Sequence, residues 1–290
     1  MSGNKSSNKS RKHFEKRKVW AGVGSALLVT SAVSGVAAPA DDSVHSAVSH
    51  SIVSFAAGSL GEGGEGESGE GEGEGEGSTK ADLATDNAAY LARLGLMRGH
   101  LWVGIKLYRE GHIAMAKTHM KHPKDELYAG LESVFKERGV AGFAGELSTL
   151  ADAVNNEQGT EAVESAYDDL LKAITASEGM EAMSAKEALM SISQMIRTAA
   201  DEYAIGVKKG EIVNVHEYQD AYGFTEIAIE RLERLSDKQK AQAESDIVNT
   251  KALLLELRNL WPTVNPQGKV EGDVSLLYGA AARIELSALN

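Results

Sequence analysis

Hydrophobic residues recur at helical spacing through most of the chain after residue 80. One series runs through Leu91, Leu94 and Leu101, and another through Leu254 and Leu257. Apolar residues three, four or seven positions apart lie on the same face of an α-helix. No stretch alternates between apolar and polar residues for long enough to predict a sheet. The pattern therefore predicts an all-α fold built of antiparallel helical bundles, with about eight or nine helices.

Capping signals and chain breaks place the ends of these helices. In a capping box, a short polar side chain and a Glu or Gln three residues later bond to each other's free backbone N–H groups. Three pairs fit this pattern: Ser184 with Glu187, Asn214 with Glu217, and Ser236 with Gln239. With glycines and Pro123 as breaks, the signals predict helices over 82–109, 112–121, 123–138, 140–156, 160–178, 184–208, 214–235, 237–260 and 270–288.

A short break from Ser177 to Glu181 divides the helices into two groups. We expect an N-terminal helical domain over 81–178 and a C-terminal domain over 184–290. The C-terminal group has four long helices joined by short connections, which is typical of an antiparallel four-helix bundle.

The first residues have the pattern of an export signal. Basic residues from Arg11 to Lys18 precede an apolar run from Val19 to Val36, and Ala38-Pro39-Ala40 follows. This order of charged, apolar and small residues predicts a cleavable signal peptide over 1–40, with an uncleaved anchor as the alternative. Both alternatives predict a periplasmic protein, secreted or anchored at its N-terminus. An uncleaved signal would be the part of the chain that contacts a membrane.

A low-complexity segment separates the signal from the helices. Between Gly58 and Gly77 glycine and glutamate dominate, and they alternate without interruption from Gly69 onward. Glycine gives the backbone high entropy and the glutamates repel one another, so residues 41–80 are predicted to be a disordered linker. The alternative is that the carboxylates of this linker loosely hold hard cations.

Composition excludes several classes of function. The chain has no cysteine, which rules out disulfide scaffolds, zinc ribbons, c-type haem sites and thiol enzymes. Its net charge of −12 repels phosphate groups, so no nucleic-acid partner is expected. No nucleophile elbow or phosphate loop occurs in a suitable context, and we do not expect an enzyme.

The histidines of the helical region are concentrated between residues 100 and 122. His119, His122 and Glu126 are spaced so that they could share a face, and His100 would join them from the preceding helix. Imidazole nitrogens suit iron, copper and zinc, so these four residues are a candidate metal site. Two alternatives remain: the histidines are exposed among lysines, or His100 and another residue ligate haem.

A second candidate site combines His216, Glu217 and Asp220 at helical spacing. Helical bundles commonly build iron sites from carboxylates on neighbouring helices. Glu217 also has a structural explanation as a member of the predicted capping box. The Glu-x-x-His pairs of ferritin-like di-iron centres do not occur in the chain, which disfavours oxidase chemistry of that type.

Part of the C-terminal group resembles a known family. The run Asp201-Glu202-Tyr203, the segment Val207–Asn214, and Glu217-Tyr218-Gln219-Asp220 followed by Phe224 are similar to the helical extracytoplasmic domain of bacterial high-affinity iron permeases. The resemblance covers about 184–290. Asp220 stands where the family pattern usually has Glu, which preserves the charge.

The resemblance implies an accessory role in metal uptake. The sequence has neither the downstream membrane helices nor the Arg-Glu-x-x-Glu motif of the permease itself, so we expect an accessory domain that does not transport the ion. It further implies iron as the bound metal, although the candidate ligands also suit copper or zinc, and an inner-membrane metal permease or another envelope protein as partner. The alternative is a metal-free structural or protein-interaction bundle at the cell envelope.

Overall fold

The computed structural model of the chain describes residues 81–290, except for the side chains of His122, Asp125 and Glu126. Most of these residues are helical, which confirms the predicted all-α fold. The predicted signal peptide (1–40) and linker (41–80) lie outside the described residues and stay predictions. Among the described helices, none combines the length and apolar character needed to cross a membrane.

The helices of the first half are mostly of moderate length. They are α1 (Asn87–Arg109), α2 (Ile113–His122), α3 (Glu132–Arg138), α4 (Ala144–Asn155) and α5 (Thr160–Glu178). A π-helical turn (Pro123–Tyr128) and a 3-10 turn (Ala129–Leu131) connect α2 to α3.

The second half contains four longer helices and one short helix. They are α6 (Ala185–Gly206), α7 (Val215–Glu233), the short α8 (Asp237–Gln242), α9 (Glu244–Leu257) and α10 (Val274–Leu289). Two-residue strands β1 (Val207–Lys208) and β2 (Glu211–Ile212) form an antiparallel hairpin between α6 and α7. Single 3-10 turns follow α5 (Met180–Ala182) and α9 (Arg258–Leu260).

Two of the three predicted capping boxes are confirmed. Ser184 and Ser236 each exchange hydrogen bonds with the residue three positions later. At the start of α7, Asn214 is the N-cap, but its side chain accepts from the backbone N–H of His216. The Glu217 carboxylate accepts instead from the side-chain amide of Asn214, at 3.3 Å. The third capping box was therefore wrong, although the cap residue was right.

The backbone departs from the expected helices at three places. Pro123 does not open a separate helix, because the chain continues through it as a π-helical turn. The helix expected over 237–260 is interrupted at Ala243, between α8 and α9. The hairpin was not foreseen, since two-residue strands are too short to show alternation; its turn residues Lys209 and Gly210 both have positive φ.

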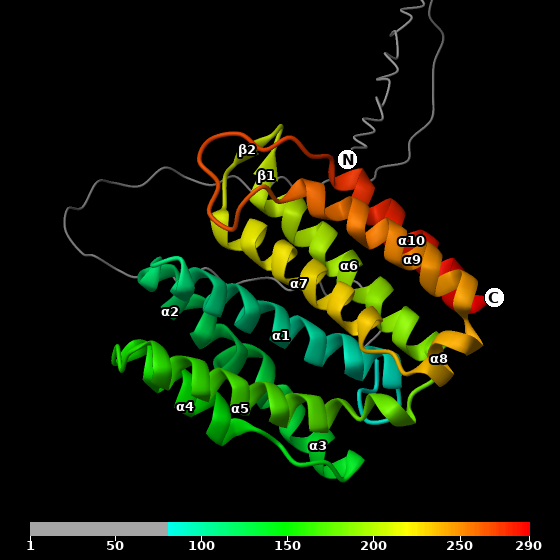
Figure 1. Ribbon diagram of the computed structural model, residues 1–290, viewed down its shortest axis with the longest axis horizontal. Coiled ribbons are helices and arrows are strands. Elements are labelled where there is room, and N and C mark those ends of the chain that lie inside the picture. Colours follow the sequence, from blue (N-terminus) through cyan, green and yellow to red (C-terminus); the bar gives the residue numbers. More distant parts are fainter. Residues whose placement is uncertain (1–80) are drawn as a thin grey trace, which may run out of the picture. The chain divides into compact units, whose positions relative to one another are not determined.

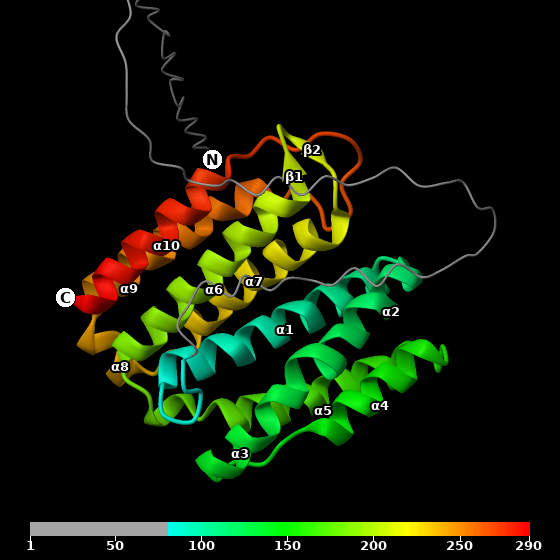
Figure 2. The ribbon, with the colours of Figure 1, turned by 180° about the vertical axis from the view of Figure 1, so that it is seen from behind.

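The helices lie in successive layers, in both views of the molecule (Figures 1 and 2). α9 and α10 cover one side of α6 and α7, and α1 packs against the other side. α2, α4 and α5 lie beyond α1. The buried apolar residues form two clusters, one centred on α6, α7, α9 and α10 and one on α1 to α5. α1 contributes to both clusters, so it joins the two groups of helices.

An ion-pair network is buried where α5 ends. The Glu178 carboxylate lies 2.9 Å from Nη2 of Arg231 and 2.8 Å from Nη1 of Arg234, both on or at the end of α7. Arg98 of α1 lies 3.4 Å from Glu178 and 2.5 Å from the Glu230 carboxylate. We call these five residues the Glu178 network. It ties α1, α5 and α7 together.

Candidate metal centre

α1 and α7 make a backbone contact at a pair of glycines. A Cβ atom at Gly223 would lie 2.4 Å from the carbonyl oxygen of Gly99, and one at Gly99 would lie 2.4 Å from Cδ1 of Phe224. A larger residue at Gly223 would collide with the backbone of α1, and one at Gly99 would displace the Phe224 ring and press on the backbone of α7. This close approach allows His100, adjacent to Gly99, to reach Asp220 on the facing helix.

Two histidines face one carboxylate oxygen. Nδ1 of His100 lies 2.7 Å from Oδ1 of Asp220, and Nδ1 of His119, on α2, lies 3.2 Å from the same oxygen. All three residues are buried. Among the described residues, His100, His119 and Asp220 form the one group whose potential ligand atoms lie close enough to hold a metal ion, all within 4.8 Å of one another. We call these three residues the His-Asp centre.

Gln219 fixes which nitrogen of His119 faces the centre. The side-chain amide of Gln219 donates to the carbonyl oxygen of Val264, at 3.1 Å, and a carbonyl can only accept. The amide oxygen of Gln219 therefore points the other way and lies 2.8 Å from Nε2 of His119. An oxygen there requires a proton on Nε2. In neutral His119 the lone pair is then on Nδ1, the nitrogen that faces Asp220.

The Asp220 carboxyl is held in its ionised form. Burial alone would raise its pKa, but the charges and hydrogen bonds of His100 and His119 outweigh burial and hold the pKa well below its ordinary value. A buried carboxylate needs positive charge nearby, which a proton on an imidazole or a bound cation can supply. The centre thus has the charge of a cation site.

The two distances to the Asp220 oxygen can be compared with those around a transition metal. Metal–nitrogen and metal–oxygen bonds of about 2.0–2.2 Å place neighbouring ligand atoms about 3–4 Å apart. The separation between His119 and Asp220 lies in this range, at 3.2 Å. The 2.7 Å between His100 and Asp220 is a hydrogen-bond length and would lengthen by a few tenths of an ångström when an ion replaced the proton. Two imidazoles and one carboxylate are a donor set typical of non-haem iron.

The structure combines members of the two predicted sites into one centre. His100 and His119 came from the first prediction and Asp220 from the second. The half-buried His216 lies beside them, with its ring 5.3 Å from that of His119. Glu217 bonds at the cap of α7 and is not part of the metal-spaced group. The side chains of His122 and Glu126 lie outside the described part of the structure.

The segment that contains Asp220 matches a known family of protein domains. Residues 178–285 match the family model of the iron permease-associated 4-helix bundle domain. This confirms the resemblance found in the sequence. The match extends from the end of α5 into α10 and covers less than half of the chain. No curated protein and no solved structure matches the chain.

The iron permease-associated bundle supplies only part of the centre. Asp220, Gln219 and His216 lie within it, whereas His100 and His119 come from helices that precede it. The name of the domain associates this segment with iron permease systems.

Sequence reasoning missed Gln219 and the two glycines. Gln219 lies between Tyr218 and Asp220 in the run that carries the family resemblance, and it gave no signal of its own. Gly99 and Gly223 did give a signal that could have been used. Glycine inside a helix costs about 1 kcal/mol relative to alanine, so a glycine there often indicates a close packing contact.

Proposed function

We propose that this chain is an exported, periplasmic accessory protein of an iron uptake system, and that it binds iron as cargo at the His-Asp centre. The observation that carries the proposal is the convergence of His100, His119 and Asp220 from three helices on one buried point. The iron permease-associated bundle supports iron over other metals. Copper and zinc would also suit these ligands, since imidazole binds both well.

The surroundings of the centre suit an ion that binds and leaves. Three protein ligands leave coordination positions for water or for a ligand on the partner. His216 is half-buried and its ring lies 5.3 Å from that of the fully buried His119, so it is a further imidazole beside the centre. We infer that His216 receives the ion on its way to His119.

An inner-membrane iron permease is the proposed partner. The domain's family name supports this choice. A bundle in the periplasm would deliver the ion to the permease from outside, and the chain itself would not transport it. Fractionation of cells producing the full chain tests the location: recovery in the cytoplasmic fraction would contradict export.

Metal binding is tested by titrating the purified chain with ferrous iron under anaerobic conditions, and with zinc and cupric ions. We expect one tight site per chain. Asp220→Asn removes the charge at nearly constant volume, and His119→Ala removes a ligand. Each should weaken binding by at least about 100-fold, because even residues behind the ligands cost 10–100-fold when changed.

Two matched controls identify the centre. His112→Ala removes a half-buried histidine outside the metal-spaced group, and Glu217→Gln removes a carboxylate that bonds at the cap of α7. Both should leave affinity unchanged. A wild-type chain that binds no metal would favour the metal-free bundle, and equal losses in the controls would place the ion elsewhere.

A further inference from the structure

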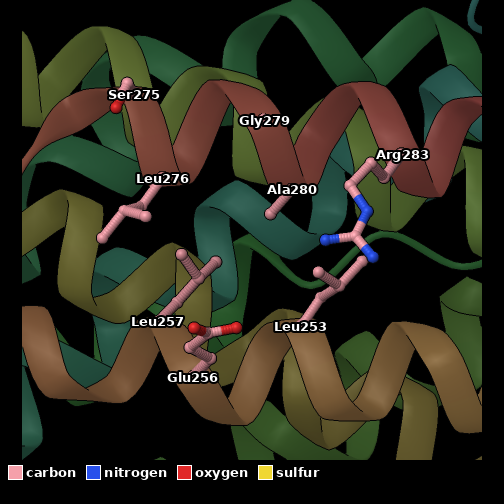
Figure 3. A pocket seen from close by; sticks show the side chains of 8 residues that line it. All are labelled: Leu253, Glu256, Leu257, Ser275, Leu276, Gly279, Ala280 and Arg283. Carbon is pink, nitrogen blue, oxygen red and sulfur yellow. The ribbon is translucent and has the colours of Figure 1, made fainter.

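An ion can reach the His-Asp centre only if part of the structure moves. The exposed fraction of His100 is 7%, that of Asp220 is 2% and that of His119 is 0%. A groove of about 200 Å³ lies elsewhere, between α9 and α10 (Figure 3), and residues of those two helices line it. It contains no residue of the centre, so it does not lead an ion there. The path must be opened by the elements that surround the ligands.

Two of the three helices that carry the ligands are held firmly together. The backbones of α1 and α7 meet at Gly99 and Gly223. The same two helices share the Glu178 network, in which charged side chains from both are buried. Backbone contact and buried ion pairs both resist separation. The ligands on these helices, His100 and Asp220, therefore stay in place relative to each other.

The third helix, α2, carries His119 and is seated more loosely. It packs mainly on α1 and α4 and contacts α7 little. Where it meets α1, the space beside Gly104 is filled by the side chain of Met120, whose Cε would lie 2.8 Å from a Cβ built at the glycine. A methionine side chain has three rotatable bonds and adapts readily. Among the described residues, His119 and Met115 make the polar contacts of α2 with α7.

The sequence of α2 gives this helix little stability of its own. It has 10 residues, fewer than an isolated helix needs in water. Its N-cap is His112, whose side chain makes no capping bond, and its first turn has no acidic residue. The chain then continues as a π-helical turn, a form that is frequent at functional sites. A short, poorly capped helix is expected to open locally before the rest of the fold.

We propose that α2 is the gate of the His-Asp centre. Local unfolding of α2 moves His119 away from Asp220 and admits the ion, and refolding of α2 around the ion closes the centre. His216, which lies on α7 beside the His119 ring, stays in place and holds the ion during this step. The inference rests on the proposed function, because it describes how the same site is loaded.

A gate of this kind has a kinetic signature. If the ion enters and leaves only through the open form, both rates are proportional to the population of that form. A substitution in α2 that touches no ligand changes the stability of the closed form equally with and without the ion. The association and dissociation rates should then change by the same factor, and the dissociation constant should stay the same.

Two substitutions shift the opening of α2 in opposite directions. Aspartate is a preferred N-cap residue and its charge suits the start of a helix, so His112→Asp should make opening about fivefold rarer. Ala114→Gly, at an exposed position of α2, should make it about fivefold more frequent. Ala252→Gly, at an exposed position of α9, is the matched control. Thermal melting checks that all three variants are folded.

Two measurements on the metal-free chain test the opening itself. In hydrogen exchange followed by mass spectrometry, the amides of α2 should exchange faster than those of α1 and α7. Diethyl pyrocarbonate acylates neutral imidazole and should modify the buried His119 at a rate set by opening. Both rates should fall in His112→Asp, rise in Ala114→Gly and stay unchanged in Ala252→Gly.

Stopped-flow mixing with ferrous iron under anaerobic conditions measures association, and transfer to a chelator measures dissociation. Both rates should fall about fivefold in His112→Asp and rise about fivefold in Ala114→Gly, with the dissociation constant unchanged. Ala252→Gly should match the wild type.

The proposal would be overturned if the amides of α2 exchanged as slowly as those of α1 and α7. Metal rates that ignore both α2 variants, or that change equally in Ala252→Gly, would also overturn it. Tight binding with such rates would leave the proposed function intact without the gate. Opening of α2 in a chain that binds no metal would contradict the proposed function, and the gate with it, while the exchange data for α2 would stand.

Discussion

The two buried polar centres that join α1 to α7 differ in the cations that face their carboxylates. In the Glu178 network, a fully buried carboxylate meets three arginines, Arg98, Arg231 and Arg234. In the His-Asp centre, Asp220 meets two histidines. Arginine keeps its proton under all ordinary conditions, whereas histidine can give its proton up and offer a lone pair.

This difference would separate a structural centre from the proposed binding centre. The Glu178 carboxylate is already surrounded by permanent positive charge, so a metal ion there would be repelled. The groups that face Asp220 are imidazoles, whose protons a metal ion can replace. Gln219 also directs the lone pair of neutral His119 toward Asp220. Burial and a carboxylate are common to both centres. The neighbouring side chain decides which one can take an ion.

The largest expected effect separates the centres by stability. Glu178→Gln would leave buried arginines without their counter-charge and should lower the free energy of unfolding by about 3–5 kcal/mol. Asp220→Asn should lower it by only about 1–2 kcal/mol, because the histidines can become neutral. Urea denaturation of the metal-free chains measures both. Equal losses would contradict the comparison.

The pH dependence of stability sharpens the first result. Burial would raise the pKa of Glu178, but Arg231, Arg98 and Arg234 outweigh it and lower this pKa from its ordinary value of 4.5. A carboxyl with a lowered pKa in the folded state stabilises the fold above its unfolded pKa, and this contribution is lost as the pH falls through the folded value. The stability difference between wild type and Glu178→Gln should therefore be full above pH 4.5 and shrink in acid. A difference that grows in acid would contradict this.

The next effect concerns the glycine contact beside the His-Asp centre. Gly99→Ala forces α1 away from α7 and should cost about 1–3 kcal/mol of stability. It should also weaken metal binding, because His100 moves with α1. Gly279→Ala is the matched control: it lies in an open helix surface and should raise stability by up to about 1 kcal/mol. Calorimetric melting and metal titration report the two effects.

Gln219 allows a test of the lone-pair argument. Gln219→Leu removes the acceptor for Nε2 of His119 and should weaken metal binding by about 10–100-fold. Gln219→Glu keeps an acceptor there and should retain most of the affinity, although it loses the bond to Val264. A purely structural role for Gln219 would make the two variants equally weak. Absorption of the cobalt-substituted chain shows whether the coordination changes.

The smallest expected effect is at Glu217. Among the described residues, its carboxylate accepts from Asn214 at the cap of α7 and from no other side chain, and an amide oxygen can do the same. Glu217→Gln should therefore change stability by less than about 0.5 kcal/mol, within the range of ordinary surface substitutions. A marked loss in urea denaturation would show that the negative charge acts beyond the cap.

Local signals predicted most of the fold. Ser184 and Ser236 marked helix starts because their capping partners lie within the same four residues. Ala243 gave no warning that α8 and α9 would separate, since alanine favours helix. Pro123 gave a misleading signal. A proline often begins a helix, but here the chain continues through Pro123 as a π-helical turn.

The centre could be predicted only in parts. His100 and His119 were grouped because they are near in sequence, and Asp220 was assigned to a separate site because it is about a hundred residues away. Their contact depends on the crossing of α1 and α7, which no local pattern records. The same holds for Glu178 and its arginines, whose pairing follows from tertiary packing alone.

The glycine contact also bears on selectivity among ions. Side chains adjust to a ligand by changing rotamer, but two backbones in contact have no such freedom. A small widening between His100 and Asp220 needs only a side-chain adjustment, whereas a large one requires whole helices to separate. A small ion with short bonds fits with a slight adjustment, whereas calcium, which takes six to eight oxygens at about 2.3–2.6 Å, would have to push the bundle apart. At the proposed site, the stiffness of the Gly99–Gly223 crossing would thus act as a size filter among ions.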